Sequence, residues 1–213
     1  MRTRFSLMLL CSSLVPLVPL VPLAAQGAQA IEDVPQICAT CHGMNGVPKE
    51  SNIPNLWGQS EAYLSEQLRA FRSGKRVSDF MNPIIYQLSD EQIARAASHF
   101  ASQAAAKEVS LHWSGDKWPG DMETGERLAL AGKPERNLPA CVACHGPSGV
   151  GVMPLFPRLA GQDPAYLKRQ LIYWKADKRP LGAMGSMPAI AKSLSEAEMD
   201  AVANYFAAQG VAK

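Results

Sequence analysis

The motif Cys-x-x-Cys-His occurs twice in this chain, at Cys38–His42 and at Cys141–His145. This spacing allows two thiols to bond covalently to the vinyl groups of one haem, while the adjoining histidine ligates the iron. We therefore expect two covalently bound haem c groups. The predicted attachment and ligand residues are Cys38, Cys41 and His42 for one haem and Cys141, Cys144 and His145 for the other.

The same motif could instead form a disulfide or contribute to a zinc site. Every cysteine after residue 30 belongs to one of the two motifs, so an exported protein could oxidise each pair to a disulfide. That reading leaves the following histidine unexplained in both places. A single zinc site with four thiolates would need both motifs to meet, whereas their duplicated flanks favour one complete site per copy. Haem attachment is the interpretation that uses every residue of the motif.

Residues 1–30 have the layout of a cleaved secretory signal peptide. Arg2 and Arg4 precede an apolar run, and small residues follow at Ala28-Gln29-Ala30. Three prolines interrupt the run, which disfavours the alternative of an uncleaved membrane anchor. We therefore expect export to the periplasm, with peripheral membrane association left open.

Charge excludes one class of partner. Without Arg2 and Arg4 the formal net charge falls from +2 to zero, and haem propionates would make it negative. Binding to nucleic acid needs a concentrated basic face, so we expect no nucleic-acid partner.

An internal repeat surrounds the motifs. A shift of 103 residues places Pro54, Leu56, Gly58, Gln59, Ala62, Tyr63, Leu64, Gln67 and Leu68 on Pro157, Leu159, Gly161, Gln162, Ala165, Tyr166, Leu167, Gln170 and Leu171. Farther along the offset is 106, which places Met81, Leu88, Ser89 and Phe100 on Met187, Leu194, Ser195 and Phe206. Such a duplication indicates two domains of one fold. We predict domains at residues 31–103 and 121–213, joined by a linker at 104–120.

The periodicity within each copy is helical. Ile93, Ala96, Ala97 and Phe100, and in the second copy Met199, Val202, Ala203 and Phe206, follow the spacing of one helix face. Capping boxes precede both stretches, at Ser89 with Gln92 and at Ser195 with Glu198. No segment alternates with period two. The predicted fold class is all-α, with two tandem cytochrome c-like domains that each wrap around one covalent haem.

The sixth ligand of each iron decides between electron transfer and catalysis. Met81 and Met187 repeat, and a thioether ligand favours ferrous iron. Met184 is a rival for the second haem, because it lies three residues before Met187. His99 and His112 have no counterparts in the repeat and are weaker candidates.

The surroundings of the predicted iron ligands repeat only in part. Pro54 and Pro157 each follow their histidine by 12 residues, so each carbonyl could accept the histidine Nδ1 proton and orient the ring. Arg158 lies beside Pro157 where the first copy has Asn55, which offers a haem propionate a cationic partner in the second copy. This asymmetry predicts unequal potentials for the two haems.

These motifs resemble the cytochrome c4 family of periplasmic di-haem cytochromes. The likeness rests on both Cys-x-x-Cys-His motifs, on the segments that begin at Pro54 and Pro157, and on the stretches that begin at Met81 and Met187. It implies His/Met ligation at both irons, a pseudo-twofold arrangement that brings the haem edges together, and hydrogen bonds from the histidines to the two proline carbonyls. The chain departs from the family in a short lead before Cys38, a tryptophan-rich linker and the loop 182–187.

The resemblance implies an electron carrier that is not an enzyme, acting between a quinol-cytochrome c reductase and a terminal oxidase. A second hypothesis is the cytochrome subunit of a periplasmic dehydrogenase that oxidises sulfide or an alcohol. A third is a catalytic di-haem enzyme, such as a thiosulfate dehydrogenase, which would need one labile sixth position.

Overall fold

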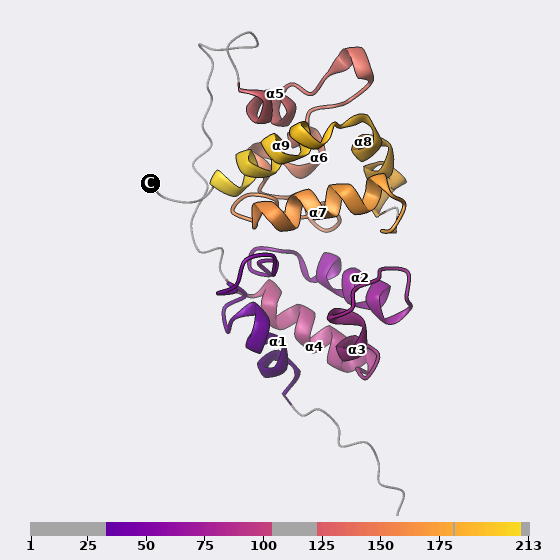
Figure 1. Cartoon of the computed structure of the whole chain (residues 1–213). Helices are drawn as coiled ribbons and strands as arrows, with labels where there is room; N and C mark the ends of the chain where they lie inside the picture. The colour runs from indigo at the N-terminus through magenta and orange to yellow at the C-terminus, as the bar shows by residue number, and fades with distance from the viewer. Residues whose placement is uncertain (1–32, 104–122, 181, 210–213) are drawn as a thin grey trace, which may run out of the picture. The chain divides into compact units, whose positions relative to one another are not determined.

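Helices and long loops make up the computed structural model, which describes residues 33–103, 123–180 and 182–209 (Figure 1). The first group of helices comprises α1 (Val34–His42), α2 (Glu61–Arg72), α3 (Met81–Ile85) and α4 (Asp90–Ala101). The second comprises α5 (Thr124–Leu130), α6 (Val142–His145), α7 (Pro164–Lys175), α8 (Met187–Ser193) and α9 (Glu196–Ala208), with short 3₁₀ turns at Pro134–Arg136, Pro147–Gly149 and Ala183–Gly185.

The all-α prediction is confirmed for the part of the chain that the structure describes. Extended pairing there is limited to two isolated bridges, Lys133 with Leu138 and Val152 with Phe156. None of the helices in the described ranges is long and apolar enough to span a membrane. The predicted signal peptide at 1–30 and the linker at 104–120 lie outside the described residues.

Local sequence explains where the longer helices begin. Ser89 and Ser195 start α4 and α9 with the predicted capping boxes, because each hydroxyl accepts an N–H bond from the third helical residue, whose side chain bonds back. Asp163 accepts from Tyr166 N–H at the start of α7, where Pro164 follows as expected. Ser60 does the same for α2.

Each group of helices has its own core. In the first, α4 contributes Ile93, Ala96, Ala97 and Phe100, all of them buried. In the second, α9 contributes Met199, Val202, Ala203 and Phe206, also buried. The last helix of each copy packs on the opening helix of the same group, α4 on α1 and α9 on α5. Burying one apolar face of these helices supplies most of their stability.

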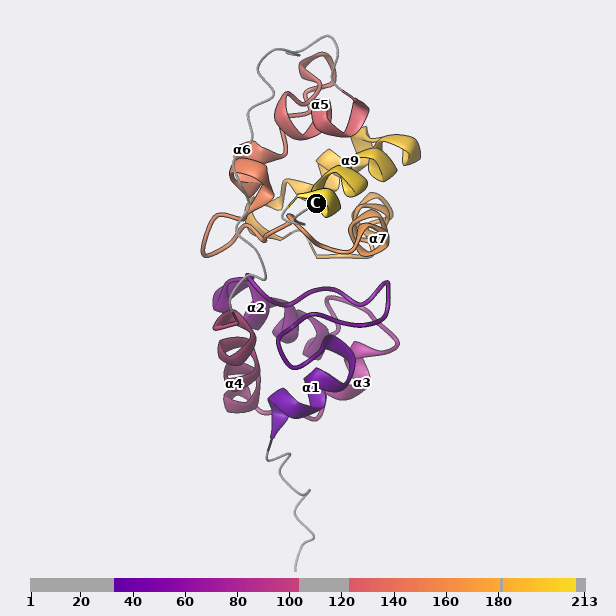
Figure 2. The same cartoon turned by 90° about the vertical axis from the view of Figure 1, so that its left-hand side faces the viewer.

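Both groups belong to one compact unit, Ile31–Lys213. In the two views α2 and α7, which are equivalent in the repeat, lie on the edges at which the groups meet (Figures 1 and 2). Hydrogen bonds cross this junction, for example from Ser60 Oγ to the carbonyl of Pro154 at 2.6 Å.

Candidate haem sites

The two motif histidines have matching surroundings. His42 is the last residue of α1, His145 is the last of α6, and both side chains are buried. His42 Nδ1 bonds to the carbonyl of Pro54 at 3.0 Å, and His145 Nδ1 bonds to the carbonyl of Pro157 at 2.8 Å. A carbonyl oxygen can only accept, so Nδ1 carries the proton and Nε2 keeps its lone pair.

The protonation of these rings suits metal ligation. Burial lowers the pKa of both histidines, and the proline carbonyl opposes this only in part. A neutral imidazole with a fixed Nδ1–H tautomer is the form that ligates iron through Nε2.

The motif glycines fix the chain direction after each histidine. Gly43 has φ +75°, and a Cβ there would lie 2.1 Å from the carbonyl oxygen of Val47. Gly146 has φ +76°. A side chain at either position would be strained, so these glycines allow the loop to turn back under the histidine.

The four motif cysteines carry free thiols. Burial raises the pKa of Cys38 to about 11 and that of Cys141 to about 12. Within the described ranges no group of three or more His, Cys, Asp and Glu side chains is placed to hold a metal ion. Neither the disulfide nor the zinc alternative gains support from the structure.

One cavity of about 1550 Å³ brings the predicted site residues together. Its lining includes Cys38, Cys41, His42, Met81, Cys141, Cys144, His145 and Met187, and also Pro54, Pro157 and Arg158. The volume exceeds the roughly 300–1,000 Å³ of a pocket for a single drug-sized ligand. Both copies of the motif therefore open onto a common space with room for more than one large group.

The candidate sixth ligands differ in whether they line the cavity. Met81 and Met187 begin the short helices α3 and α8, are half-buried and line the cavity. Met184 is 82% exposed and is not among the lining residues. His99 also lies outside the lining, where its Nε2 is 3.4 Å from the carbonyl oxygen of Met44. His112 lies outside the described residues.

Arg158 has an unused buried donor. Its Nε donates to the carbonyl of Ala160 at 3.1 Å, and its guanidinium stacks on Trp57 at 4.8 Å from the ring centre. Its Nη2 is buried and has no hydrogen-bond partner among the described residues. An orphaned cationic donor that lines the cavity fits a carboxylate of a bound group.

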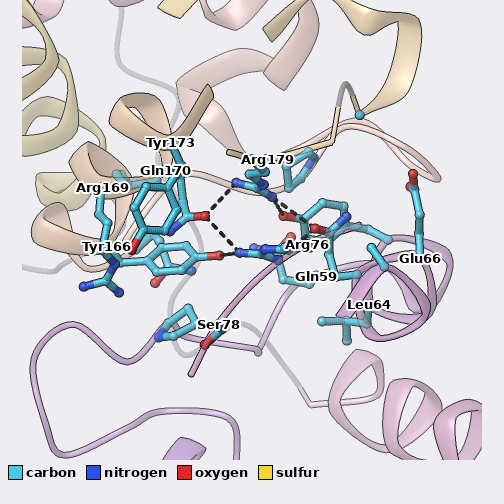
Figure 3. A pocket seen from close by; sticks show the side chains of 18 of the residues that line it. Gln59, Leu64, Glu66, Arg76, Ser78, Tyr166, Arg169, Gln170, Tyr173 and Arg179 are labelled. Atoms are coloured by element: carbon cyan, nitrogen blue, oxygen red, sulfur yellow. Dashed lines mark hydrogen bonds between the residues drawn. The ribbon is translucent and has the colours of Figure 1, made fainter. Parts of the chain in front are cut away.

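A symmetric cluster of polar side chains lines the cavity where the two groups of helices meet (Figure 3). Arg76 donates to Gln67 Oε1 at 2.8 Å, to Gln170 Oε1 at 2.9 Å and to the Tyr166 hydroxyl at 3.0 Å. Arg179 makes the mirror-image bonds, to Gln170 Oε1 at 3.1 Å, Gln67 Oε1 at 3.1 Å and the Tyr63 hydroxyl at 3.0 Å.

This cluster holds two buried cations that have no acidic partner in the part of the chain that the structure describes. Neither Arg76 nor Arg179 forms an ion pair with a carboxylate of the described residues. Burial, and after it the like charge of Arg76, lowers the pKa of Arg179. Burying unpaired charge is costly, so the cluster fits a ligand that brings its own anions. Haem carries two propionates, and the residues around the cavity therefore fit two haem groups.

Sequence reasoning missed Arg76 and Arg179. They are 103 residues apart, as are Phe71 and Trp174, on whose rings the two guanidinium groups stack at 4.4 and 3.8 Å from the centres. Extending the first offset by eight residues past Leu68 would have found the pair. The proposed contact between Arg158 and a haem propionate stays a prediction, and the structure adds two repeat-related arginines, Arg76 and Arg179, that line the cavity from both copies.

Comparisons with known proteins agree with this geometry. A family model described as "Cytochrome C oxidase, cbb3-type, subunit III" matches residues 121–206. A thiosulfate dehydrogenase electron acceptor from Stutzerimonas stutzeri (strain A1501) is 41% identical over 81% of this chain and 79% of its own length. A cytochrome c4 from Pseudomonas aeruginosa is 35% identical over 79% of this chain and 82% of its own.

Two solved structures are similar as well. Reduced recombinant cytochrome c4 from Pseudomonas stutzeri has a TM-score of 0.70 and 31% identity, over 81% of this chain and 93% of that one. A thiosulfate dehydrogenase from Marichromatium purpuratum has a TM-score of 0.69 and 37% identity. The match covers 81% of this chain but 36% of that larger protein.

Proposed function

This chain belongs to the cytochrome c4 family of di-haem electron carriers, and from that premise we propose that it accepts electrons from a periplasmic thiosulfate-oxidising dehydrogenase and passes them towards a terminal oxidase. When bound, haem supplies a reversible one-electron couple at each iron. The protein's own residues would hold and orient the two haem groups and would balance their negative charge.

The proposed first site uses Cys38 and Cys41 for attachment and His42 and Met81 as axial ligands. The hydrogen bond from His42 Nδ1–H to the carbonyl of Pro54 fixes the ring of His42 and leaves Nε2 free for iron. Met81 lines the same cavity from the start of α3. Two permanent protein ligands would leave little to rearrange during electron transfer.

The proposed second site uses Cys141, Cys144, His145 and Met187 in the same roles. Met187 is preferred to Met184 because it lines the cavity, whereas Met184 is 82% exposed. Arg158, Arg76 and Arg179 would neutralise the acidic propionates. Residues 31–103 and 121–213 are the proposed haem domains.

The observation that carries the proposed role is that both sites open onto one cavity, as a two-haem relay requires. The choice of donor rests on relatives: two thiosulfate dehydrogenase electron acceptors are 41% and 37% identical to this chain. A quinol-cytochrome c reductase is the second candidate donor, supported by the similarity to cytochromes c4. We propose that the mature protein acts in the periplasm after removal of residues 1–30, because both candidate roles need a periplasmic electron carrier.

Stopped-flow reduction of the oxidised two-haem protein tests this proposal. Thiosulfate with a purified thiosulfate dehydrogenase should reduce both haems, at least about tenfold faster than quinol with its reductase. Thiosulfate alone is the control and should reduce neither haem. Faster reduction by the quinol system would select the second donor, and turnover of thiosulfate without the dehydrogenase would indicate a catalytic haem instead.

A further inference from the structure

One peptide group connects the first motif histidine to the other half of the molecule. The carbonyl oxygen of Pro54 accepts from His42 Nδ1 at 3.0 Å. The N–H of the same peptide group belongs to Asn55 and donates to Gln162 Oε1 at 2.8 Å. Gln162 completes the contact by donating from Nε2 to the carbonyl of Asn55 at 3.0 Å.

The second motif histidine has the mirror arrangement. The carbonyl oxygen of Pro157 accepts from His145 Nδ1 at 2.8 Å. The N–H of that peptide group belongs to Arg158 and donates to Gln59 Oε1 at 3.0 Å. Gln59 Nε2 donates to the carbonyl of Arg158 at 2.8 Å.

The two glutamines are buried and equivalent in the repeat. Gln59 is 7% exposed and Gln162 is 5% exposed, and they are 103 residues apart in sequence. Each uses both ends of its amide to clamp the residue that follows the histidine-bonded proline of the opposite half. A buried amide satisfied at both ends is rigid and specific, so the chain holds each clamp in one geometry.

Hydrogen bonds in a chain polarise one another. A peptide N–H that donates to an acceptor makes the carbonyl of the same peptide group a stronger acceptor. A stronger acceptor at Nδ1 raises the basicity of the imidazole towards its metal, and a more basic ligand favours ferric iron. The clamp on each peptide group would therefore lower the potential of an iron ligated by that histidine.

We propose that Gln162 tunes the haem ligated by His42 and that Gln59 tunes the haem ligated by His145, each acting across the junction as a positioning residue. The inference rests on the haem ligation proposed above. It makes the two halves electronically dependent on their association, since neither histidine has its complete hydrogen-bond chain within its own half.

Redox titration of two full-length, two-haem variants tests the crossed assignment. Haem methyl NMR signals, assigned through contacts with Cys38 and Cys41 or with Cys141 and Cys144, identify each haem. In Gln162→Leu the reduced-to-oxidised ratio of the first haem at fixed potential should rise by up to about tenfold, ~59 mV for one electron, with the second haem unchanged. Gln59→Leu should do the reverse. The Nδ1 proton signal of the opposite histidine should shift in each case.

Two further variants keep the test decisive. Met matches Gln in length and lacks the amide, so Gln59→Met and Gln162→Met should reproduce the crossed pattern if a Leu variant fails to fold. Asn52→Gly is the control. It removes the hydrogen bond from Arg169 Nη1 to Asn52 Oδ1 across the same junction, and glycine suits the φ of 69° at residue 52. Both haem potentials should therefore stay unchanged.

A shift confined to the haem of the substituted half, or equal shifts of both haems, would overturn the inference. Failure of the proposed haem ligation is distinguishable, because it would appear in the unsubstituted protein as missing covalent haem or as an open sixth position.

Discussion

Two methionines three residues apart, Met184 and Met187, lie in different surroundings. Met187 begins α8 and lines the cavity, whereas Met184 has φ 59° in the preceding turn and a side chain that is 82% exposed. An exposed thioether cannot reach an iron inside the cavity unless its loop rearranges. The positions of the two side chains therefore favour Met187 over Met184 as the proposed sixth ligand of the second haem.

Met187→Leu removes the thioether and keeps the apolar volume. We expect the reduced-to-oxidised ratio of the second haem at fixed potential to fall at least about tenfold, ~59 mV for one electron, because a ligand that favours ferrous iron is lost. Reduced Met187→Leu should also bind carbon monoxide. Redox titration and the carbon monoxide difference spectrum measure both effects. Met184→Leu is the matched control and should leave potential and spectrum unchanged; the opposite pattern would make Met184 the ligand.

The first site is tested in the same way through Met81. Met81→Ala should lower the potential of the first haem and open it to carbon monoxide, while mass spectrometry still finds two covalent haems. Met44, which is 58% exposed and absent from the cavity lining, provides the control Met44→Ala. A Met81→Ala protein that titrates like the unsubstituted one would remove Met81 from the ligand set.

Glu198 connects helix α9 to the segment that follows α5. It completes the capping box of α9 through the N–H of Ser195 and also accepts hydrogen bonds from Lys133 and Arg136, near the 3₁₀ turn after α5. Burial alone would raise the pKa of Glu198, but these donors outweigh burial and lower it from 4.5 to about 2. The carboxylate is therefore held in its charged form.

A depressed carboxylate pKa stabilises the fold above the unfolded-state value and loses that contribution as pH falls through the folded-state value. The stabilisation by Glu198 should thus be complete above about pH 4.5 and disappear towards pH 2. Glu198→Gln should lower the free energy of unfolding at pH 7 by about 1.5–3 kcal/mol, since hydrogen bonds to a charged group are lost. Urea unfolding of both proteins should give free energies of unfolding that become equal as the pH falls towards 2. A difference that does not change between pH 7 and pH 2 would contradict this account.

How far the elements could be predicted depends on the range of the interactions that define them. Capping boxes at Ser89 and Ser195 and the apolar faces of α4 and α9 are local patterns, so the sequence predicted them correctly. Helices α3 and α8, which begin at the two proposed methionine ligands, were not predicted. With five and seven residues, they are too short for an apolar period to show.

The predicted site residues line one cavity. They could be predicted because each lies at a fixed distance in sequence from its histidine or recurs in the repeat. The cross-junction contacts could not be predicted in that way. In the sequence, Gln59 and Gln162 are only a matched pair of the repeat, and their hydrogen-bond partners lie 99 and 107 residues away. Which half contacts which depends on how two folded units pack, and no local pattern carries that information.

Both halves of the molecule contribute to the cluster around Arg76 and Arg179. Each guanidinium bonds the glutamine of its own half and both the glutamine and the tyrosine hydroxyl of the other. Two buried cations beside the cavity disfavour the additional positive charge of ferric iron at either site. The cluster should therefore raise both potentials together, whereas each glutamine clamp acts on one haem.

Replacing either cation removes a charge from both sites at once. In Arg179→Gln and in Arg76→Gln the reduced-to-oxidised ratios of both haems at fixed potential should fall, by about threefold to tenfold, up to ~59 mV per electron. Arg95→Gln is the control for loss of charge, because Arg95 is an exposed residue of α4 and water screens it. Redox titration with the haems distinguished by NMR measures each ratio. If only one haem responds, the cluster acts on a single site. If neither haem responds, the charge of the two arginines does not influence the haem potentials, which would contradict this account.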